Sequence, residues 1–156
     1  MDETHRERWA ELYRRSFPDV YRALVATLLD REVALDALHD AFEEGLRRPP
    51  GDDRNLPGWL YRVGLRKARR GLFARRRQVA LDVEPAADGG LGVTLDALES
   101  GRLLGLLTER QRSIVVAHYF LGLTQQEIAD LLGLRRGTVG ATISQALARM
   151  RLAAHA

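Results

Sequence analysis

Apolar residues recur along the chain at helical spacing, and no segment alternates with a period of two over a convincing length. The clearest repeat lies between residues 123 and 151. There Ile128, Leu131 and Leu132 occupy positions i, i+3 and i+4, which predicts a helix with one apolar face. A second helix is predicted by the repeat, at i, i+4, i+8 and i+11, of Val139, Ile143, Leu147 and Met150. The fold class predicted from this pattern is all-α.

The ends of these two helices carry their own signals. Thr124 and Glu127 have the spacing of a capping box, in which each side chain accepts a hydrogen bond from the backbone of the other residue. Gly133 is expected to end the first helix in a left-handed conformation, and the second helix is expected to begin near Arg136. Two helices joined by a short glycine-bearing turn predict a helix-turn-helix, whose second helix enters the major groove of DNA. An αα-hairpin in a helical bundle is the alternative.

The remaining helical segments are expected over residues 4–29, 32–47 and 57–77, and then from about residue 94 onwards. Pro18 marks a point at which the first of them can restart. Leu35, Leu38 and Phe42 form the apolar line of the second. Another capping-box pattern begins at Thr108.

Residues 78 to about 92 are rich in acidic residues and glycine and poor in large apolar groups, which is typical of a flexible linker. The chain is therefore expected to form two small helical domains. One spans residues 1–77, the linker spans 78–93, and the helix-turn-helix domain spans 94–156.

The distribution of charge adds a second candidate for nucleic-acid binding. The formal net charge is only +3, but eight basic residues lie in the third helix with no acid between them. Such a block is typical of a phosphate-binding helix. A solvated surface is the alternative, but the absence of acids within the block argues against it, because salt-bridged surface helices mix the two signs of charge. These residues are Arg62, Arg66, Lys67, Arg69, Arg70, Arg75, Arg76 and Arg77. The second helix has an acidic face, which is either simply solvated or a docking surface for a basic partner.

Several classes of function find no support. Cysteine is absent, which excludes disulfides and thiolate metal sites, and the four histidines show no ligand spacing. No Ser/His/Asp set, phosphate loop or paired-carboxylate site is visible, so we expect no enzyme, no catalytic or metal-binding residue and no cofactor. No apolar run approaches the roughly 18 residues of a membrane span. The first residues do not form a secretory signal, so we expect a cytoplasmic protein without membrane insertion.

The order of these parts resembles a bacterial RNA polymerase sigma factor of the extracytoplasmic-function (ECF) group, which keeps only regions two and four of the sigma family. Residues 34–42, ALDALHDAF, and residues 59–63, WLYRV, are similar to segments of region two. The most specific similarity is to region four, because several fixed spacings agree together. It lies in residues 107–112, LTERQR, with 122–129, GLTQQEIA, and 137–139, GTV.

The resemblance implies partners and site residues. The partners are core RNA polymerase through its clamp helices and flap, promoter DNA, and an anti-sigma factor. Polymerase binding falls to Asp36, His39, Asp40 and Phe42. Binding and opening of the minus-ten element fall to Arg54, Asn55, Arg62, Arg66, Lys67, Arg69 and Arg70. Reading of the minus-thirty-five element falls to Arg135, Arg136, Thr138, Gly140, Ala141, Ser144 and Gln145.

The chain departs from the family pattern in both DNA-binding parts. Arg66 stands where asparagine is usual, and arginine can only donate hydrogen bonds. The outward face of the last helix is less basic than in many members, so we expect modest DNA affinity that tethering to polymerase compensates. Trp59 and Tyr61 are candidates for stacking on bases, with a place in the core as the alternative. Two other functions stay open: a sigma-like adaptor that melts no DNA, and a stand-alone helix-turn-helix regulator.

Overall fold

A computed structural model describes residues 3–51, 55–79 and 101–155, with the side chains of 72–79 excepted. All the regular structure in these ranges is helical, so the all-α prediction is confirmed for them. Residues 101–105 are also helical. The longer helices are α1 (Glu3–Leu28), α2 (Arg31–Arg47), α3 (Leu56–Val79), α5 (Glu109–Tyr119), α6 (Gln125–Leu132) and α7 (Arg136–Ala154).

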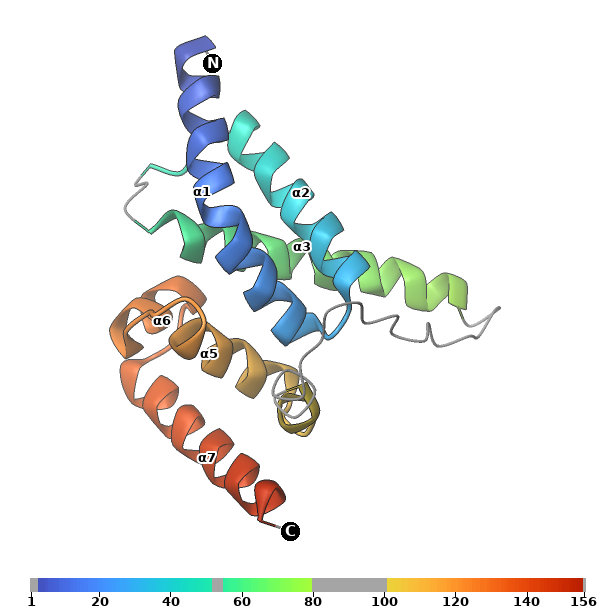
Figure 1. The fold of residues 1–156 in the computed structure, drawn as a ribbon, viewed down its shortest axis with the longest axis vertical. Helices are drawn as coiled ribbons and strands as arrows, with labels where there is room; N and C mark the ends of the chain where they lie inside the picture. The colour runs from blue at the N-terminus through green and yellow to red at the C-terminus, as the bar shows by residue number, and fades with distance from the viewer. Residues whose placement is uncertain (1–2, 52–54, 80–100, 156) are drawn as a thin grey trace.

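Helices α1, α2 and α3 pack on one another and form the N-terminal half (Figure 1). Leu24, Leu38 and Leu60 are fully buried where the three helices meet. The turn between α1 and α2 is fixed locally, because the Asp30 carboxylate accepts a hydrogen bond of 3.0 Å from the Val33 backbone N–H and so caps α2. The first three helices therefore bury apolar side chains against one another.

The restart considered at Pro18 does not occur, because α1 is a single helix with Pro18 inside it. A proline within a helix removes one backbone hydrogen bond and crowds the preceding turn. Here the proline is exposed, while the helix is anchored on both sides of it by the buried residues Trp9 and Val20. Packing at the two ends thus outweighs the local cost of the proline.

The buried face of α2 is made of smaller residues than the sequence pattern suggested. Leu38 is fully buried as expected, but Leu35 is only partly buried. The face is completed by small residues, which let the neighbouring helices approach closely: Ala34, Ala37, Ala41 and Gly45. A Cβ atom on Gly45 would lie 1.8 Å from Cζ2 of Trp9, so the α1–α2 crossing requires glycine there.

The C-terminal half contains the predicted helix-turn-helix. Both halves of the Thr124–Glu127 capping box form, with distances of 3.1 Å and 3.0 Å, and Gly133 ends α6 with φ 68°. The capping box predicted at Thr108 also forms, at the start of α5. These local predictions are confirmed. They could be made from the sequence because a cap depends on residues only three positions apart.

Replacing Thr124 with alanine is expected to lower the free energy of unfolding by about 1 kcal/mol, because the Glu127 N–H loses its acceptor. Urea denaturation measures this change. Thr124→Ser keeps the hydroxyl and is the control. Equal stability of the alanine and serine variants would contradict the role of the cap.

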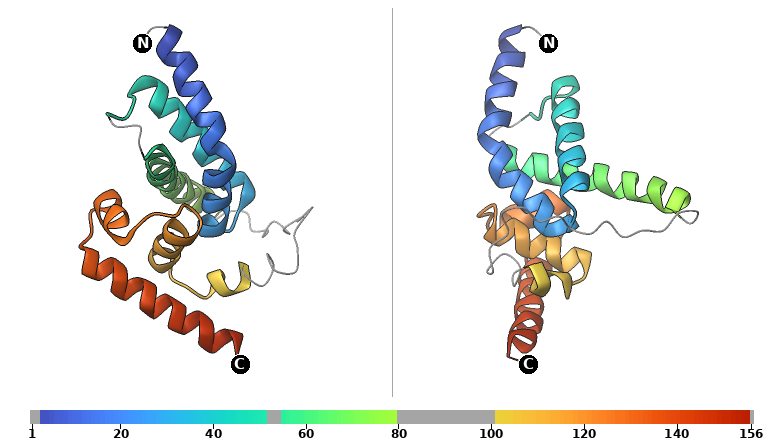
Figure 2. Two further views of the ribbon diagram at one scale, coloured as in Figure 1. Left: turned by 60° about the vertical axis from the view of Figure 1, so that its left-hand side comes forward. Right: turned by 45° about the vertical axis from the view of Figure 1, so that its right-hand side comes forward.

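The two halves lie against each other, α1 on α5 and α3 on α6 (Figure 2). Their buried apolar side chains belong to one cluster. Helix α3 continues to Val79, so the linker predicted from residue 78 begins two residues later at the earliest. The rest of that linker, and the start of the helix expected from residue 94, lie outside the described residues. Within the described ranges, no helix combines the length and apolar character of a membrane span.

Candidate nucleic-acid interface

The face of α7 that was predicted from the sequence to point outward is exposed to solvent. Val139 and Ile143 of the predicted apolar repeat are buried together with Ala146, whereas Leu147 and Met150 are only partly buried. Their opposite face is exposed at Ala141, Ser144, Gln145 and Ala148. The exposed face therefore carries one hydroxyl and one side-chain amide, which can exchange hydrogen bonds with base edges.

Positive charge gathers at the first turn of α7. Arg135 is the N-cap residue and makes no side-chain cap hydrogen bond, and the first turn holds no acidic residue. Arg135 and Arg136 are both exposed. Free backbone N–H groups, the positive end of the helix dipole and two guanidinium groups thus coincide, an arrangement suited to a phosphate group.

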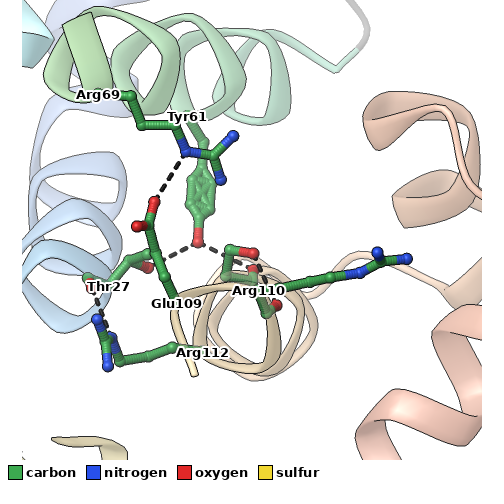
Figure 3. Close-up of polar contacts among 7 residues, drawn as sticks. Thr27, Tyr61, Arg69, Glu109, Arg110 and Arg112 are labelled. Atoms are coloured by element: carbon green, nitrogen blue, oxygen red, sulfur yellow. Dashed lines mark hydrogen bonds and ion pairs between the residues drawn. The ribbon is translucent and has the colours of Figure 1, made fainter. Parts of the chain in front are cut away.

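A groove of about 510 Å³ separates this turn from α5. It is lined by Arg110, Gln111, Gly137, Thr138, Ala141, Thr142 and Gln145. Arg110 was not identified from the sequence, because its place opposite α7 depends on how the helices pack. The exposed side chain of Arg110 extends away from the Tyr61 hydroxyl (Figure 3) and adds a cation to a groove whose α7 side is largely uncharged.

Two residues assigned to the DNA-reading face lie differently from the others. Gly140 is partly buried, and a Cβ atom there would lie 2.9 Å from Oε1 of Gln125 in α6. Its place at the α6–α7 crossing gives it a packing role. Thr138 is partly buried, and its carbonyl accepts a 2.8 Å hydrogen bond from Thr142 Oγ1.

The basic block of α3 has acidic partners that come from other helices. Glu44 of α2 contacts both Arg66, at 2.6 Å, and Lys67, at 3.8 Å. Arg69 forms a 2.8 Å ion pair with Glu109 of α5. The block appeared unpaired in sequence because these acids are distant along the chain. No described carboxylate pairs with the exposed residues Arg62 and Arg70.

The loop before α3 supplies a cap. Asn55 Oδ1 accepts a 3.3 Å hydrogen bond from the Gly58 N–H, and its carbonyl accepts one of 3.1 Å from the Trp59 N–H. Asn55, assigned by resemblance to the minus-ten element, thus also fixes the start of α3. Arg54 and the side chains of residues 75–77 lie outside the described residues.

Of the two aromatic candidates for base stacking, Tyr61 belongs to the core. It is 1 % exposed, and its hydroxyl lies 2.7 Å from Thr27 Oγ1 and 2.9 Å from the Ser113 carbonyl (Figure 3). Burial raises the pKa of Tyr61 well above its usual value, so the hydroxyl remains a donor. Trp59 is partly buried and packs edge-on against Trp9, with the two ring centroids 5.7 Å apart.

The acidic face of α2 remains open to solvent. Asp36, His39 and Asp40 are exposed. Phe42, which was assigned to the same surface, is partly buried, and its ring centroid lies 4.2 Å from that of Tyr13. Of the four residues assigned to polymerase binding, the three polar ones are therefore available to a partner.

Comparison with known proteins identifies the C-terminal part. Residues 99–150 match the family model of sigma-70, region 4. Over this segment the chain is similar to sigma-70 region 4. No curated protein sequence matches the chain.

Two solved structures share the fold over nearly the whole length. The first is the sigma factor RpoE of Bartonella quintana in complex with the anti-sigma factor NepR, with 18 % identity, a TM-score of 0.75 and 96 % coverage of both chains. The second is CnrH in complex with the cytosolic domain of CnrY, with 23 % identity, a TM-score of 0.72 and coverage of 96 % of this chain and 89 % of CnrH. The chain therefore shares its fold with both structures over its N-terminal half as well as over the segment that is similar to region 4.

Proposed function

We propose that this chain is a sigma factor of the ECF type, which directs RNA polymerase to promoters and initiates transcription. The observation that carries the proposal is the exposed face of α7 within a segment that matches sigma-70 region 4. The sigma-factor fold of the full chain and the basic helix α3 support a second point of contact with the promoter. The action proposed is binding, with no chemical step.

The minus-thirty-five element would be read by α7 in the major groove. Gln145 can pair with adenine through two hydrogen bonds, and Ser144 can donate to or accept from a base edge. Arg135 and Arg136 at the helix N-terminus would hold a backbone phosphate. Arg110, across the groove from α7, would hold another and offset the low charge of the reading face.

Alanine at Arg110 is expected to weaken binding of promoter duplex and of scrambled duplex by the same factor, about two- to fivefold, because a phosphate contact carries no sequence information. Gln145→Ala is expected to change the preference between the two duplexes. Fluorescence anisotropy with labelled duplexes measures both. Arg14→Ala removes an exposed arginine of α1 and is the matched control. Equal affinities of the Arg110 and Arg14 variants would show that Arg110 does not contact the DNA.

The minus-ten element would be opened by the N-terminal half. Arg62, Arg66 and Arg70 expose their side chains along α3, where phosphates of the unpaired strand can exchange for water or for Glu44. Lys67 and Arg69 extend the same helix. Melting would follow from binding, because contacts to an opened strand favour the opened state.

Core polymerase and an anti-sigma factor are the proposed protein partners. Asp36, His39 and Asp40 give α2 an exposed face with two carboxylates, which suits a basic surface on the polymerase clamp helices. The flap is the proposed contact of the region 4 domain. The RpoE structure compared above holds a sigma factor with an anti-sigma factor, which supports an anti-sigma partner here.

Run-off transcription with core polymerase on a promoter library tests this function. Transcripts that require the chain support the sigma factor. Specific DNA binding without core polymerase and without transcripts supports a stand-alone regulator, for which the helix-turn-helix alone suffices. Polymerase binding without transcripts supports the sigma-like adaptor, which the uncharged face of α7 favours.

A further inference from the structure

The first turns of α1 extend beyond the end of α2 (Figures 1 and 2). Residues 3–8 are exposed, and the first buried residue of α1 is Trp9, which lies against Gly45 near the end of α2. A helical extension of about two turns gains little stability from its own hydrogen bonds. The beginning of α1 is therefore a surface on which a partner can pack and add stability.

One side of this part of α1 forms a shallow groove of about 720 Å³. The residues that line it, named the charged stripe, are Glu3, Arg6, Glu7, Ala10, Glu11 and Arg14. At about 100° per residue, these positions share one side of the helix. All of them are charged except Ala10, whose small side chain lets a second helix approach closely. The stripe is thus suited to a partner that carries charges of its own.

The charges of the stripe are incompletely paired within the chain. Arg14 Nη1 lies 3.1 Å from Glu11 Oε2, and both side chains are more than half exposed. Within the described ranges, no residue forms an ion pair with the side chain of Glu3, Arg6 or Glu7. These side chains can exchange water for opposite charges on a partner.

The order of charges along the stripe is complementary to its own reverse. A second copy of α1 can pack antiparallel to the first, with a twofold axis between residues 8 and 9. Glu3 then faces Arg14 of the second copy, and Arg6 faces Glu11 of the second copy. The symmetry repeats each contact, so each kind of opposite-charge pair forms twice. The remaining pair of opposed positions, residues 7 and 10, brings a glutamate against an alanine.

The same charges disfavour other alignments of the two helices. A shift by three residues in one direction places Glu7 opposite Glu7 of the second copy. The same shift in the other direction places Arg6 opposite Arg14 of the second copy. A shift by four residues leaves one kind of opposite-charge pair instead of two. Because opposed like charges weaken binding, the pattern selects a single antiparallel alignment.

We propose that the charged stripe of α1 is a self-association surface, on which a second copy of this chain packs antiparallel. The paired segment is only about 16 Å long, and its ion pairs remain close to solvent. The dimer is therefore weak, forms at high local concentration and dissociates as salt is added. It uses none of the residues assigned above to DNA or polymerase, so the proposal goes beyond the sigma function and does not depend on it.

Disulfide trapping tests the antiparallel geometry. Because the chain lacks cysteine, full-length Glu7→Cys and Ala10→Cys variants each carry a single thiol. One of them carries an affinity tag, so that mixed dimers differ in mass from homodimers. In a glutathione buffer, the mixture should give about fivefold more mixed dimer than either variant gives homodimer, because only facing positions bring the two Cβ atoms within disulfide range. Equal yields, or no disulfide, would overturn the proposal.

Charge reversal tests the ion pairs. Arg6→Glu opposes like charges at two symmetric positions and should weaken self-association about tenfold in sedimentation equilibrium at low salt. Glu11→Arg should have the same effect, and the double variant should recover the association of the unchanged chain. Residues 6 and 11 are five positions apart and are not neighbours on one helix, so the recovery has to come from the second copy.

The control is Arg22→Glu, which reverses a charge of α1 outside the stripe and should leave association unchanged. Circular dichroism checks that each variant stays helical, because Glu11→Arg also removes the ion pairs of Glu11 with Arg14 and Arg15. A double variant that associates no better than the single ones would overturn the proposal. Failure of run-off transcription by a chain that forms the trapped dimer would count against the sigma function and leave self-association supported.

Discussion

Simultaneous replacement of Arg66, Arg69 and Arg70 with alanine is expected to abolish open-complex formation. The footprint over the minus-thirty-five element is expected to remain. The three guanidinium groups belong to the helix proposed to hold the opened strand, and α7 lies in the other half of the chain. A loss of about 1 kcal/mol per arginine amounts to roughly a hundredfold in strand capture. Permanganate reactivity of unpaired thymines at the start site measures opening, and footprinting measures upstream binding.

A matched control for this triple change lies on α1. Arg14, Arg15 and Arg22 are exposed and pair with acids of their own helix, so their replacement removes the same charge from another surface. That variant should keep permanganate reactivity. Unchanged reactivity in the α3 variant would show that α3 does not hold the opened strand.

Trp9→Ala is expected to lower the free energy of unfolding by about 3–5 kcal/mol, because a nearly buried indole is lost from an aromatic cluster. Gly45→Ala is expected to cost about 1–3 kcal/mol, since the new methyl group would overlap the Trp9 ring. In the Trp9→Ala background that second cost should disappear, because the ring that it meets is gone. Urea denaturation of the two single variants and the double variant completes the cycle.

Additive costs in this cycle would mean that the α1–α2 crossing does not depend on the Trp9–Gly45 contact. Gly51→Ala is a suitable control. Gly51 is exposed, and a Cβ atom there meets nothing within 4 Å. Its replacement should leave stability almost unchanged in either background.

The sequence was informative wherever structure depends on near neighbours. Both capping boxes, the left-handed Gly133 and the buried face of α7 follow from residues within a few positions of one another. These signals predicted the helix-turn-helix and its exposed face. Which residues of that face contact DNA remains a prediction.

Features that depend on packing between distant segments were not predictable. The acidic partners of α3, Glu44 and Glu109, lie 22 and 40 residues away from the arginines that they meet. The sequence did not distinguish Tyr61 from Trp59 as a candidate for base stacking, because the contact of the Tyr61 hydroxyl with α5 depends on packing. The continuity of α1 through Pro18 likewise depends on burial at both ends.

The pairing of Glu44 with Arg66 and Lys67 has a consequence for selectivity among nucleic acids. A protein cation that neutralises a phosphate releases counterions from the nucleic acid, and each such contact on single strands adds about 0.7 to the steepness of the salt dependence of binding. When the cation leaves a carboxylate to do so, the vacated carboxylate attracts cations from solution, and the net release is smaller. Binding through α3 should therefore depend on salt less steeply than its number of basic residues implies. The helix would also bind non-specific nucleic acid weakly in the cell.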